Sequence, residues 1–333
     1  MKVLFQIRPD FLTNPAGDSM QMVYTKRYLS RLGVEVDMST VYSQDYKGYD
    51  LVHLFNLTRV VETYAYSYKA YEQGIPIVLS TIYWDNSDYY MNNELPDWKR
   101  KAWHQQNMLR KIVLSKASIL LPNSQSEAEK LIENFETEKP YHVVPNCVDR
   151  RFSLGDKDRF YKEHGLADFA LCVGRISPRK NQLALIEALE GTGIKLVLIG
   201  PVNDRKYGER CKKAGKGNVV FIPGQSSAQL RDSYAAAAIH VLPSWFETPG
   251  LSNLEAAAAA CPIATTEYGC TQEYFGELAC YCLPDDIDSI RQSILQGLEN
   301  KNGKKLQEHV LSNYTWERAA GDTLTAYKKV LEQ

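Results

Sequence analysis

Short runs of apolar residues alternate with amphipathic segments along the whole chain. The apolar runs predict buried strands, and the segments between them carry apolar residues at helical spacing. Short apolar strands that alternate with helices are typical of a parallel sheet covered by helices on both faces. In the first half the predicted strands are 2–8, 34–38, 50–55, 75–80, 118–121 and 141–144, and the predicted helices are 19–32, 59–73, 97–116 and 126–133.

The second half of the chain repeats this scheme. Its predicted strands are 170–174, 195–200, 219–222, 239–242 and 263–265, and its helices are 181–189, 227–236, 251–260, 287–298 and a last helix ending at Leu331. A chain of 333 residues is too long for one ordinary domain and suits two domains of about 150 residues each. We therefore predict two doubly wound α/β domains, with a boundary near Pro145-Asn146-Cys147-Val148-Asp149.

Composition narrows the classes of function. A net charge of −1 gives no electrostatic case for binding nucleic acid. The seven cysteines are an odd number without a Cys-x-x-Cys pair, so we expect buried reduced thiols rather than disulfides or a zinc site. The sequence begins with the predicted strand 2–8, and it has no run of eighteen or more apolar residues. We expect no signal peptide, no membrane span and a cytoplasmic location.

Two glutamates, Glu247 and Glu255, stand eight residues apart at a predicted strand–loop–helix junction. Glu247 follows a strand, where open α/β sheets bind ligands, and Glu255 lies just over one turn into an alanine-rich helix. The helix amino terminus between them offers N–H groups to an anion. This layout suits a nucleotide-diphosphate sugar. The alternative is that both are solvated carboxylates, since acidic residues are mildly favoured near a helix start.

Cations cluster at a second junction of this kind. Arg175, Arg179 and Lys180 lie between a predicted strand and a helix, where positive charge opposes the helix dipole. An anion bound there would remove that conflict. A solvated charged loop is the alternative.

These motifs resemble those of the retaining glycosyltransferases of family 4, the group 1 enzymes with the GT-B fold. The Glu-x7-Glu pair stands in Pro243-Ser244-Trp245-Phe246-Glu247-Thr248-Pro249-Gly250-Leu251-Ser252-Asn253-Leu254-Glu255-Ala256. The family's Gly-Arg-x-x-x-x-Lys element is matched by Gly174, Arg175 and Lys180 but not by Arg179, which we expect to be solvated. The segment from Val144 to Asp149 resembles an inter-domain element in which Cys147 replaces a glycine.

The resemblance implies a domain architecture. Two Rossmann-like domains would face a central cleft. They are an acceptor-side domain at 1–148 and a nucleotide-sugar domain at 149–314, and a terminal helix at 315–333 would cross back to the first domain.

The resemblance also implies roles for individual residues. Glu247 would meet the donor sugar, Glu255 the ribose, and Arg175 and Lys180 the diphosphate, together with the helix end at Gly250 and Leu251. Gly17 would let backbone approach a phosphate, with Asp18 as an N-cap, and the loop at Gln225 would contact the base.

Further residues are candidates for the cleft and the acceptor. His53 and Asn56 end a strand where relatives carry a histidine, although a lone histidine there is more often structural. Where many relatives place another histidine, this chain has Tyr83, Trp84 and Asp85, whose aromatic rings could stack on a sugar. The basic and aromatic stretch 97–116 is either a solvated helix face or a contact with an anionic membrane.

We therefore expect a metal-independent hexosyltransferase of class EC 2.4. It would move a sugar from a UDP- or GDP-linked donor to a saccharide or lipid-linked acceptor with retention, without a cofactor, in cell-surface polysaccharide or glycoconjugate synthesis. The alternatives are a nucleotide-sugar epimerase of the same fold and a non-catalytic subunit that binds nucleotide sugars.

Overall fold

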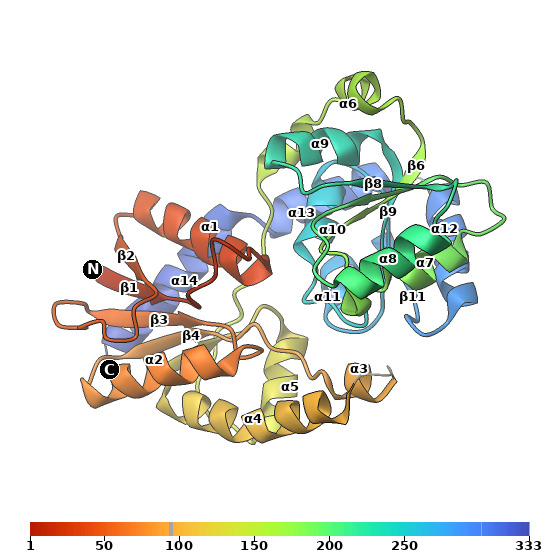
Figure 1. The fold of residues 1–333 in the computed structure, drawn as a ribbon. Coiled ribbons are helices and arrows are strands. Elements are labelled where there is room, and N and C mark those ends of the chain that lie inside the picture. Colours follow the sequence, from red (N-terminus) through yellow and green to blue (C-terminus); the bar gives the residue numbers. More distant parts are fainter. Residues whose placement is uncertain (93–95, 301, 333) are drawn as a thin grey trace. The chain divides into compact units, whose positions relative to one another are not determined.

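The chain forms two compact units. A computed structural model describes residues 1–92, 96–300 and 302–332. The first unit combines Met1–Asn146 with Trp316–Gln333, and the second is Cys147–Thr315 (Figure 1). Each contains one sheet whose strands are all parallel.

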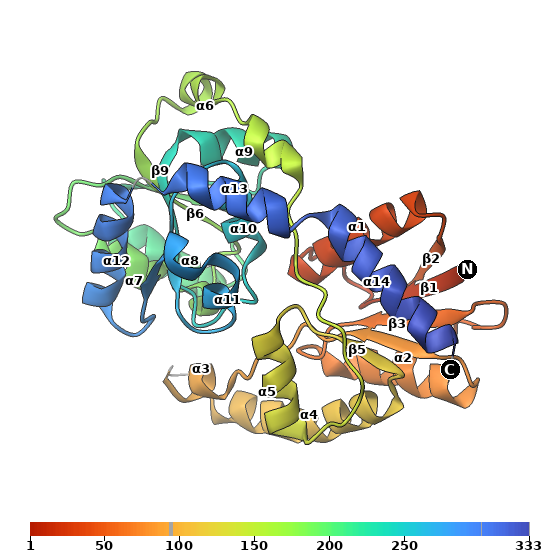
Figure 2. The ribbon, with the colours of Figure 1, turned by 180° about the vertical axis from the view of Figure 1, so that it is seen from behind.

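The first unit has a five-stranded sheet in the order β2-β1-β3-β4-β5. α1 and α14 pack together on one face, and α2 and α4 on the other (Figure 2). The strands are β1 (Lys2–Gln6), β2 (Glu35–Ser39), β3 (Leu51–Phe55), β4 (Ile77–Ser80) and β5 (Ile119–Leu121). The helices are α1 (Gly17–Arg31), α2 (Val60–Glu72), α3 (Ser87–Asn92), α4 (Asp97–Lys116), α5 (Gln125–Phe135) and α14 (Trp316–Leu331).

The second unit has a six-stranded sheet in the order β11-β10-β9-β6-β7-β8. Its strands are β6 (Phe169–Val173), β7 (Leu196–Ile199), β8 (Val219–Ile222), β9 (Ala237–Leu242), β10 (Ile263–Thr266) and β11 (Cys280–Cys282). Its α-helices are α6 (Lys157–His164), α7 (Gln182–Ala188), α8 (Arg205–Ala214), α9 (Ser227–Ala236), α10 (Leu251–Ala258), α11 (Thr271–Phe275), α12 (Ile287–Glu299) and α13 (Gly303–Asn313). Short 3-10 turns lie at η1 (Arg150–Leu154), η2 (Pro178–Lys180) and η3 (Gly276–Leu278).

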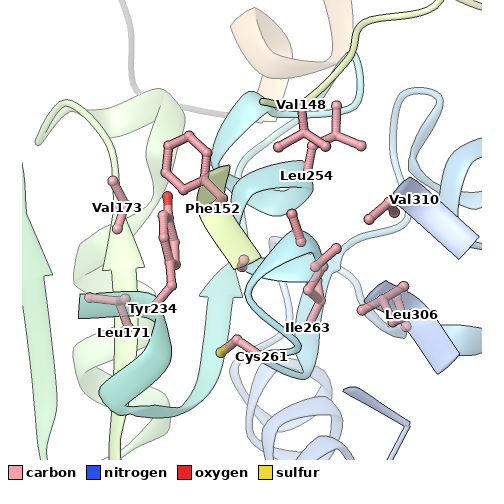
Figure 3. Close-up of a cluster of buried hydrophobic side chains, with 14 of the residues drawn as sticks. Val148, Phe152, Leu171, Val173, Tyr234, Leu254, Cys261, Ile263, Leu306 and Val310 are labelled. Carbon is pink, nitrogen blue, oxygen red and sulfur yellow. The ribbon is translucent and has the colours of Figure 1, made fainter. Parts of the chain in front are cut away.

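The alternation of side chains along β6 divides the core of the second unit between the two faces of its sheet. Leu171 and Val173 join a cluster that includes side chains of α9, α10 and α13, whereas Ala170 and Cys172 join a cluster with α7, α8 and α12. Figure 3 shows the first cluster. Because both faces are covered, the strand is apolar at every position, as the sequence pattern predicts.

One predicted strand is wrong. In the segment 141–144 only Tyr141 forms a bridge, to Leu120 of β5. β5 ends one residue later and is followed by Pro122, which accepts a hydrogen bond from the Val144 N–H but has no N–H to return. The ladder therefore stops after one pair. Cys147 also needs no left-handed conformation, because it is not among the residues with positive φ.

The sequence pattern also missed several elements. α8 has Tyr207, Gly208 and Cys211 as its buried residues, and its other residues are charged apart from Ala214. These buried positions stand at helical spacing, but one of the three is a glycine, so the apolar face of the helix is short. All seven cysteines are free and buried in this structure, which confirms the expected burial.

Candidate functional site

Adjacent strands bring the two predicted motifs together. β6 pairs directly with β9, so the loop after β6, which carries Lys180, lies beside the loop after β9, which carries Glu247. A backbone hydrogen bond of 2.9 Å from the Trp245 N–H to the Arg179 carbonyl joins these loops. The sheet order therefore places both motifs at one carboxyl edge, where parallel α/β sheets bind ligands.

The backbone of Glu247 is fixed by the loop after β10. Its N–H donates to the Tyr268 carbonyl and its carbonyl accepts from the Cys270 N–H, each across 3.0 Å. Gly269, at φ +107°, passes so close that an added Cβ would lie 1.9 Å from the Glu247 carbonyl oxygen. Only glycine fits this approach. Gly269 was not among the predicted residues, although a lone glycine just after a strand is a signal of close backbone contact.

The Glu247 carboxylate forms an ion pair with Lys180 in a largely buried setting. Glu247 is 5% exposed, and Arg179 Nη1 lies 3.7 Å from the same carboxylate oxygen that Lys180 contacts. Burial alone would raise the pKa of Glu247, but the charges of Lys180 and Arg179 outweigh it and lower that pKa below its usual value. Burial lowers the pKa of Lys180. Glu247 is therefore held as a carboxylate.

The prediction that Arg179 is solvated is wrong, because its side chain makes contacts within the protein. Its guanidinium donates to the Phe246 carbonyl across 3.0 Å and lies over the Phe246 ring, 4.8 Å from the centroid. It therefore contributes to the field around Glu247. The matched family element gave no signal for this role, because Arg179 falls outside its spacing.

The amino terminus of α10 lies against the Glu247 side chain. Gly250 caps this helix at φ +88°, and an added Cβ there would lie 3.1 Å from Glu247 Oε2. Leu251 is the first helical residue. Asn253 fixes the turn by donating to the Pro249 carbonyl and to Thr265 Oγ1, each across 3.0 Å. A carboxylate, a lysine and free helix N–H groups thus meet at one place.

Glu255, on the same helix, has different surroundings. The Tyr234 hydroxyl donates to Glu255 Oε2 across 2.8 Å. Burial raises the pKa of Glu255 to about 7, and this hydrogen bond only partly opposes the rise. Within the described residues no positive side chain contributes to that pKa.

The remaining predicted donor residues of this unit border the same edge. Arg175 stands two residues after the end of β6, and its carbonyl accepts a hydrogen bond from Gln182 across 3.0 Å. Gln225, after β8, is partly exposed and contacts Ser233 Oγ through its Oε1 at 2.8 Å. Contacts to a phosphate or a base stay predictions for both residues.

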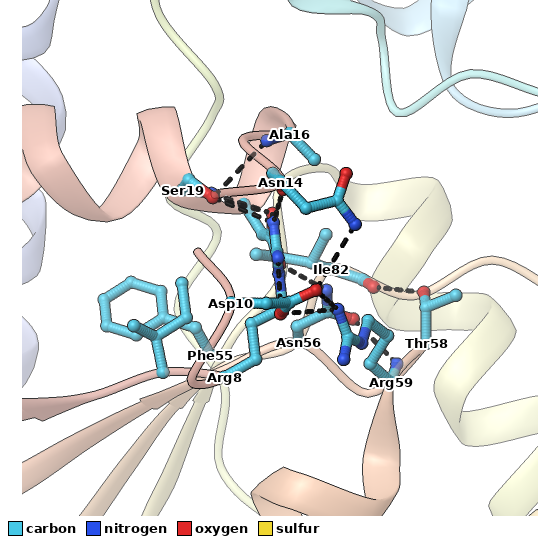
Figure 4. Close-up of polar contacts among 12 residues, drawn as sticks. Arg8, Asp10, Asn14, Ala16, Ser19, Phe55, Asn56, Thr58, Arg59 and Ile82 are labelled. Carbon is cyan, nitrogen blue, oxygen red and sulfur yellow. Dashed lines mark hydrogen bonds and ion pairs between the residues drawn. The ribbon is translucent and has the colours of Figure 1, made fainter. Parts of the chain in front are cut away.

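In the first unit, a buried network joins the carboxyl ends of β1 and β3 (Figure 4). Arg8 donates to Asp18 at 2.7 Å and to the Asn14 carbonyl at 2.8 Å, and Asn56 donates to Asp18 at 2.9 Å. Asp18 is therefore not the helix cap, because α1 is capped at Ala16. The network joins Asn56 to Asp18, the residue after Gly17, and Gly17 is exposed at the first position of α1.

His53 lies in the interior of the first unit. Its Nδ1 is 2.5 Å from the Tyr327 hydroxyl of α14 and its Nε2 is 2.9 Å from Ser80 Oγ. Burial lowers the pKa of His53 to about 3, so the ring is neutral. These contacts favour the structural role that the sequence left open for this histidine. A role in binding stays a prediction.

The three predicted residues in the segment after β4, Tyr83, Trp84 and Asp85, have different surroundings. Tyr83 is 1% exposed and stacks on Trp103, so its ring belongs to the core rather than to a sugar site. Trp84 is partly exposed. Asp85 accepts hydrogen bonds from Ser87 Oγ at 2.6 Å and from Trp103 Nε1 at 3.3 Å. Of the two aromatic side chains, Trp84 is the more exposed, and its contact with a sugar stays a prediction.

The basic stretch 97–116 forms α4. It buries Trp103, Arg110, Val113 and Leu114 and leaves Trp98 and Met108 exposed. Asp97 pairs with Arg100 and Lys101 on the exposed side. Contact of this helix with a membrane stays a prediction, and a solvated helix face stays the alternative. No described helix is long and apolar enough to cross a bilayer. Among the described residues, no cluster of three or more His, Cys, Asp or Glu side chains is suited to hold a metal ion.

Comparison with known proteins defines the class. The family model of the glycosyl transferases group 1 matches residues 156–315, which lie in the second unit. Sucrose-phosphate synthase from Thermosynechococcus elongatus has a similar structure, with a TM-score of 0.84 at 17% identity and 99% of each chain covered. Anabaena HepE in complex with UDP-glucose gives a TM-score of 0.75 at 15% identity, covering 98% of this chain and all of the other. The fold is therefore GT-B, with two Rossmann-like domains.

Curated relatives are similar over part of their length. An uncharacterised glycosyltransferase of Methanocaldococcus jannaschii is 29% identical, over 63% of this chain and 59% of its own. The matches span between 45% and 59% of the first such relatives.

Proposed function

We propose that this protein transfers a hexosyl group from a UDP- or GDP-linked sugar to a saccharide or lipid-linked acceptor, with retained configuration and without a metal at the chemical step. The observation that carries the proposal is the buried Lys180–Glu247 pair beside the amino terminus of α10, inside the region that the group 1 family model matches. Such a site holds an ionised carboxylate for sugar hydroxyls next to donors for a diphosphate.

The geometry supports a division of roles. Lys180, Arg175 and the N–H groups at the start of α10 bind the diphosphate and stabilise the charge that develops on it as it leaves. Glu247 accepts hydrogen bonds from the sugar hydroxyls, and its ionised state is maintained by Lys180 and Arg179. Glu255 accepts hydrogen bonds from the ribose.

The chemical step needs no nucleophile from the protein. The bond between the anomeric carbon and the phosphate oxygen breaks, and the bond to the acceptor oxygen forms on the same face of the sugar. The acceptor proton passes to the leaving phosphate oxygen. The protein contributes orientation and charge stabilisation to this exchange.

The test has two stages. Thermal unfolding of the purified chain with a panel of UDP- and GDP-sugars identifies the donor, because a ligand that binds the native state raises the unfolding temperature. The chosen donor is then incubated with saccharide and lipid-linked acceptors, with and without a chelator, and the anomeric configuration of the product is read by NMR. A glycoside with retained configuration, formed also with the chelator, is expected.

Other products would contradict the proposal. An epimerised nucleotide sugar formed without acceptor would indicate an epimerase. Donor binding with neither hydrolysis nor transfer to any acceptor would indicate a non-catalytic subunit. An inverted product or an absolute need for a divalent metal would reject the mechanism while keeping the class.

A further inference from the structure

A buried tyrosine contacts the proposed ribose-binding glutamate. Tyr234 of α9 is 1% exposed, and its hydroxyl donates to Glu255 Oε2 of α10 across 2.8 Å. This contact links two helices on the same face of the second sheet. Tyr234 was not a candidate from the sequence, where it reads as an ordinary apolar position of a helix.

Aromatic packing fixes the position of the Tyr234 ring. The ring meets Phe152 edge-on at a centroid distance of 5.9 Å and His240 at 5.6 Å. Figure 3 shows the Tyr234 ring beside Phe152, with its oxygen at the end of the ring away from Leu171. Because the hydroxyl lies in the plane of a rigid ring, fixing the ring also fixes the donor.

The carboxylate of Glu255 has unused capacity to accept hydrogen bonds. An ionised carboxylate offers about four lone-pair positions, and the Tyr234 hydroxyl occupies one of them. Within the described residues Glu255 has neither an ion-pair partner nor a second hydrogen-bond donor. Holding a partly buried carboxylate in this state is costly unless other donors complete it.

The donors that fit are neutral hydroxyls. A second anion would be repelled, and Tyr234 already covers one oxygen, so two adjacent hydroxyls can approach the remaining lone pairs. The 2′ and 3′ hydroxyls of a ribose form such a pair. Glu247, by contrast, already has Lys180 and Arg179.

Building on the proposed function, we propose that Tyr234 is a positioning residue that orients Glu255 toward the two ribose hydroxyls of the donor, and thereby makes the site selective for ribonucleoside over 2′-deoxyribonucleoside diphosphates. Tyr234 does not touch the nucleotide in this arrangement. Its effect passes through Glu255 alone.

Calorimetric titration tests this link. UDP, GDP and their 2′-deoxy forms are titrated into wild type, Y234F, E255A and the double variant. The control is Y281F, which removes the hydroxyl that Tyr281 donates to the Gly276 carbonyl in the same unit. Circular dichroism and thermal unfolding confirm that each variant is folded.

We expect wild type to prefer the ribose form by about tenfold or more, as is usual for hydrogen bonds to a charged group. Y234F should weaken binding of the ribose form by about tenfold and of the deoxy form much less. In the E255A background Y234F should have no further effect, and Y281F should behave as wild type. An equal loss from Y234F with and without Glu255 would overturn the inference.

The pH dependence separates positioning from a merely structural role. The Tyr234 hydroxyl stabilises the charged form of Glu255, so its loss should move the fall in ribonucleotide affinity to higher pH. A profile that does not move would overturn the inference and leave the proposed function intact. A folded wild type that binds neither UDP nor GDP would overturn both.

Discussion

Glu247 and Glu255 differ in the charge that surrounds them, although they stand eight residues apart at one sheet edge. Glu247 lies beside Lys180 and Arg179, and its pKa is lowered. In the part of the chain that the structure describes, the neutral Tyr234 hydroxyl is the hydrogen-bond donor to the Glu255 side chain, and burial raises the pKa of Glu255 to about 7. Both are removed from bulk water to a large extent, so the presence of cations decides the direction of the shift.

This difference indicates which interactions each carboxylate can offer to a ligand. Glu247 stays charged, so its carboxylate can accept a hydrogen bond from a sugar hydroxyl without a change in protonation. Glu255 is balanced between two protonation states near neutral pH, and a pair of hydroxyl donors would favour its charged form. Perturbed carboxylates of this kind cluster at functional sites.

The largest effect is expected from removing Glu247. Glu247→Ala should lower kcat by about 10³-fold, because it removes a contact aimed at the reacting sugar. Binding of UDP or GDP, measured by calorimetry, should change little.

Glu255→Ala should have the reverse effect, with a large loss of nucleotide affinity and a smaller loss of kcat. Equal profiles for the two variants would remove the distinction between the sites.

Lys180→Met should lower kcat by about 100-fold, because it takes away a charge from the diphosphate and the partner of Glu247. It should also lower the free energy of unfolding by roughly 3 kcal/mol, since a buried carboxylate loses its main cation. Urea unfolding and steady-state kinetics measure both effects. Lys213→Met, on the exposed side of α8, is the matched control and should change neither.

The pH dependence of stability should have opposite signs for the two glutamates. Glu255 has a folded pKa of about 7 against an ordinary 4.5, so its stabilisation is full below 4.5 and is lost as pH rises through 7. Glu255→Gln should therefore gain stability relative to wild type between pH 5 and pH 8. Glu247 has a lowered pKa, so its stabilisation is present above 4.5 and is lost on acidification. Urea unfolding across pH measures both trends, and a Glu255→Gln difference that is flat from pH 5 to pH 8 would contradict them.

Arg179→Met should give the smallest effect, a loss of about two- to fivefold in kcat, because a partly exposed ion pair at 3.7 Å contributes little. Lys180 would continue to hold Glu247 in its charged form. Steady-state kinetics beside Lys180→Met measures this ranking. A loss as large as that of Lys180→Met would show that Arg179 itself contacts the donor.

The period of the hydrophobic pattern is enough to specify much of this fold. β8, α4 and α9 begin and end at the predicted residues, because a buried strand or a well-bounded amphipathic helix is encoded locally. The motif spacing likewise placed Lys180 and Glu247 on loops that follow strands. Short segments with few apolar positions, such as α8, were missed.

Which charges meet depends on the tertiary fold. The pairing of β6 with β9 brings Lys180 and Arg179 to Glu247 across 67 and 68 residues of sequence, and the packing of α9 against α10 brings Tyr234 to Glu255. The same holds for His53, whose partners come from β4 and from α14. The period of apolar residues is set by neighbours in the chain, whereas the burial and the electrostatic partners of a side chain are set by its neighbours in space. The opposite protonation tendencies of two similar glutamates therefore follow from the fold alone.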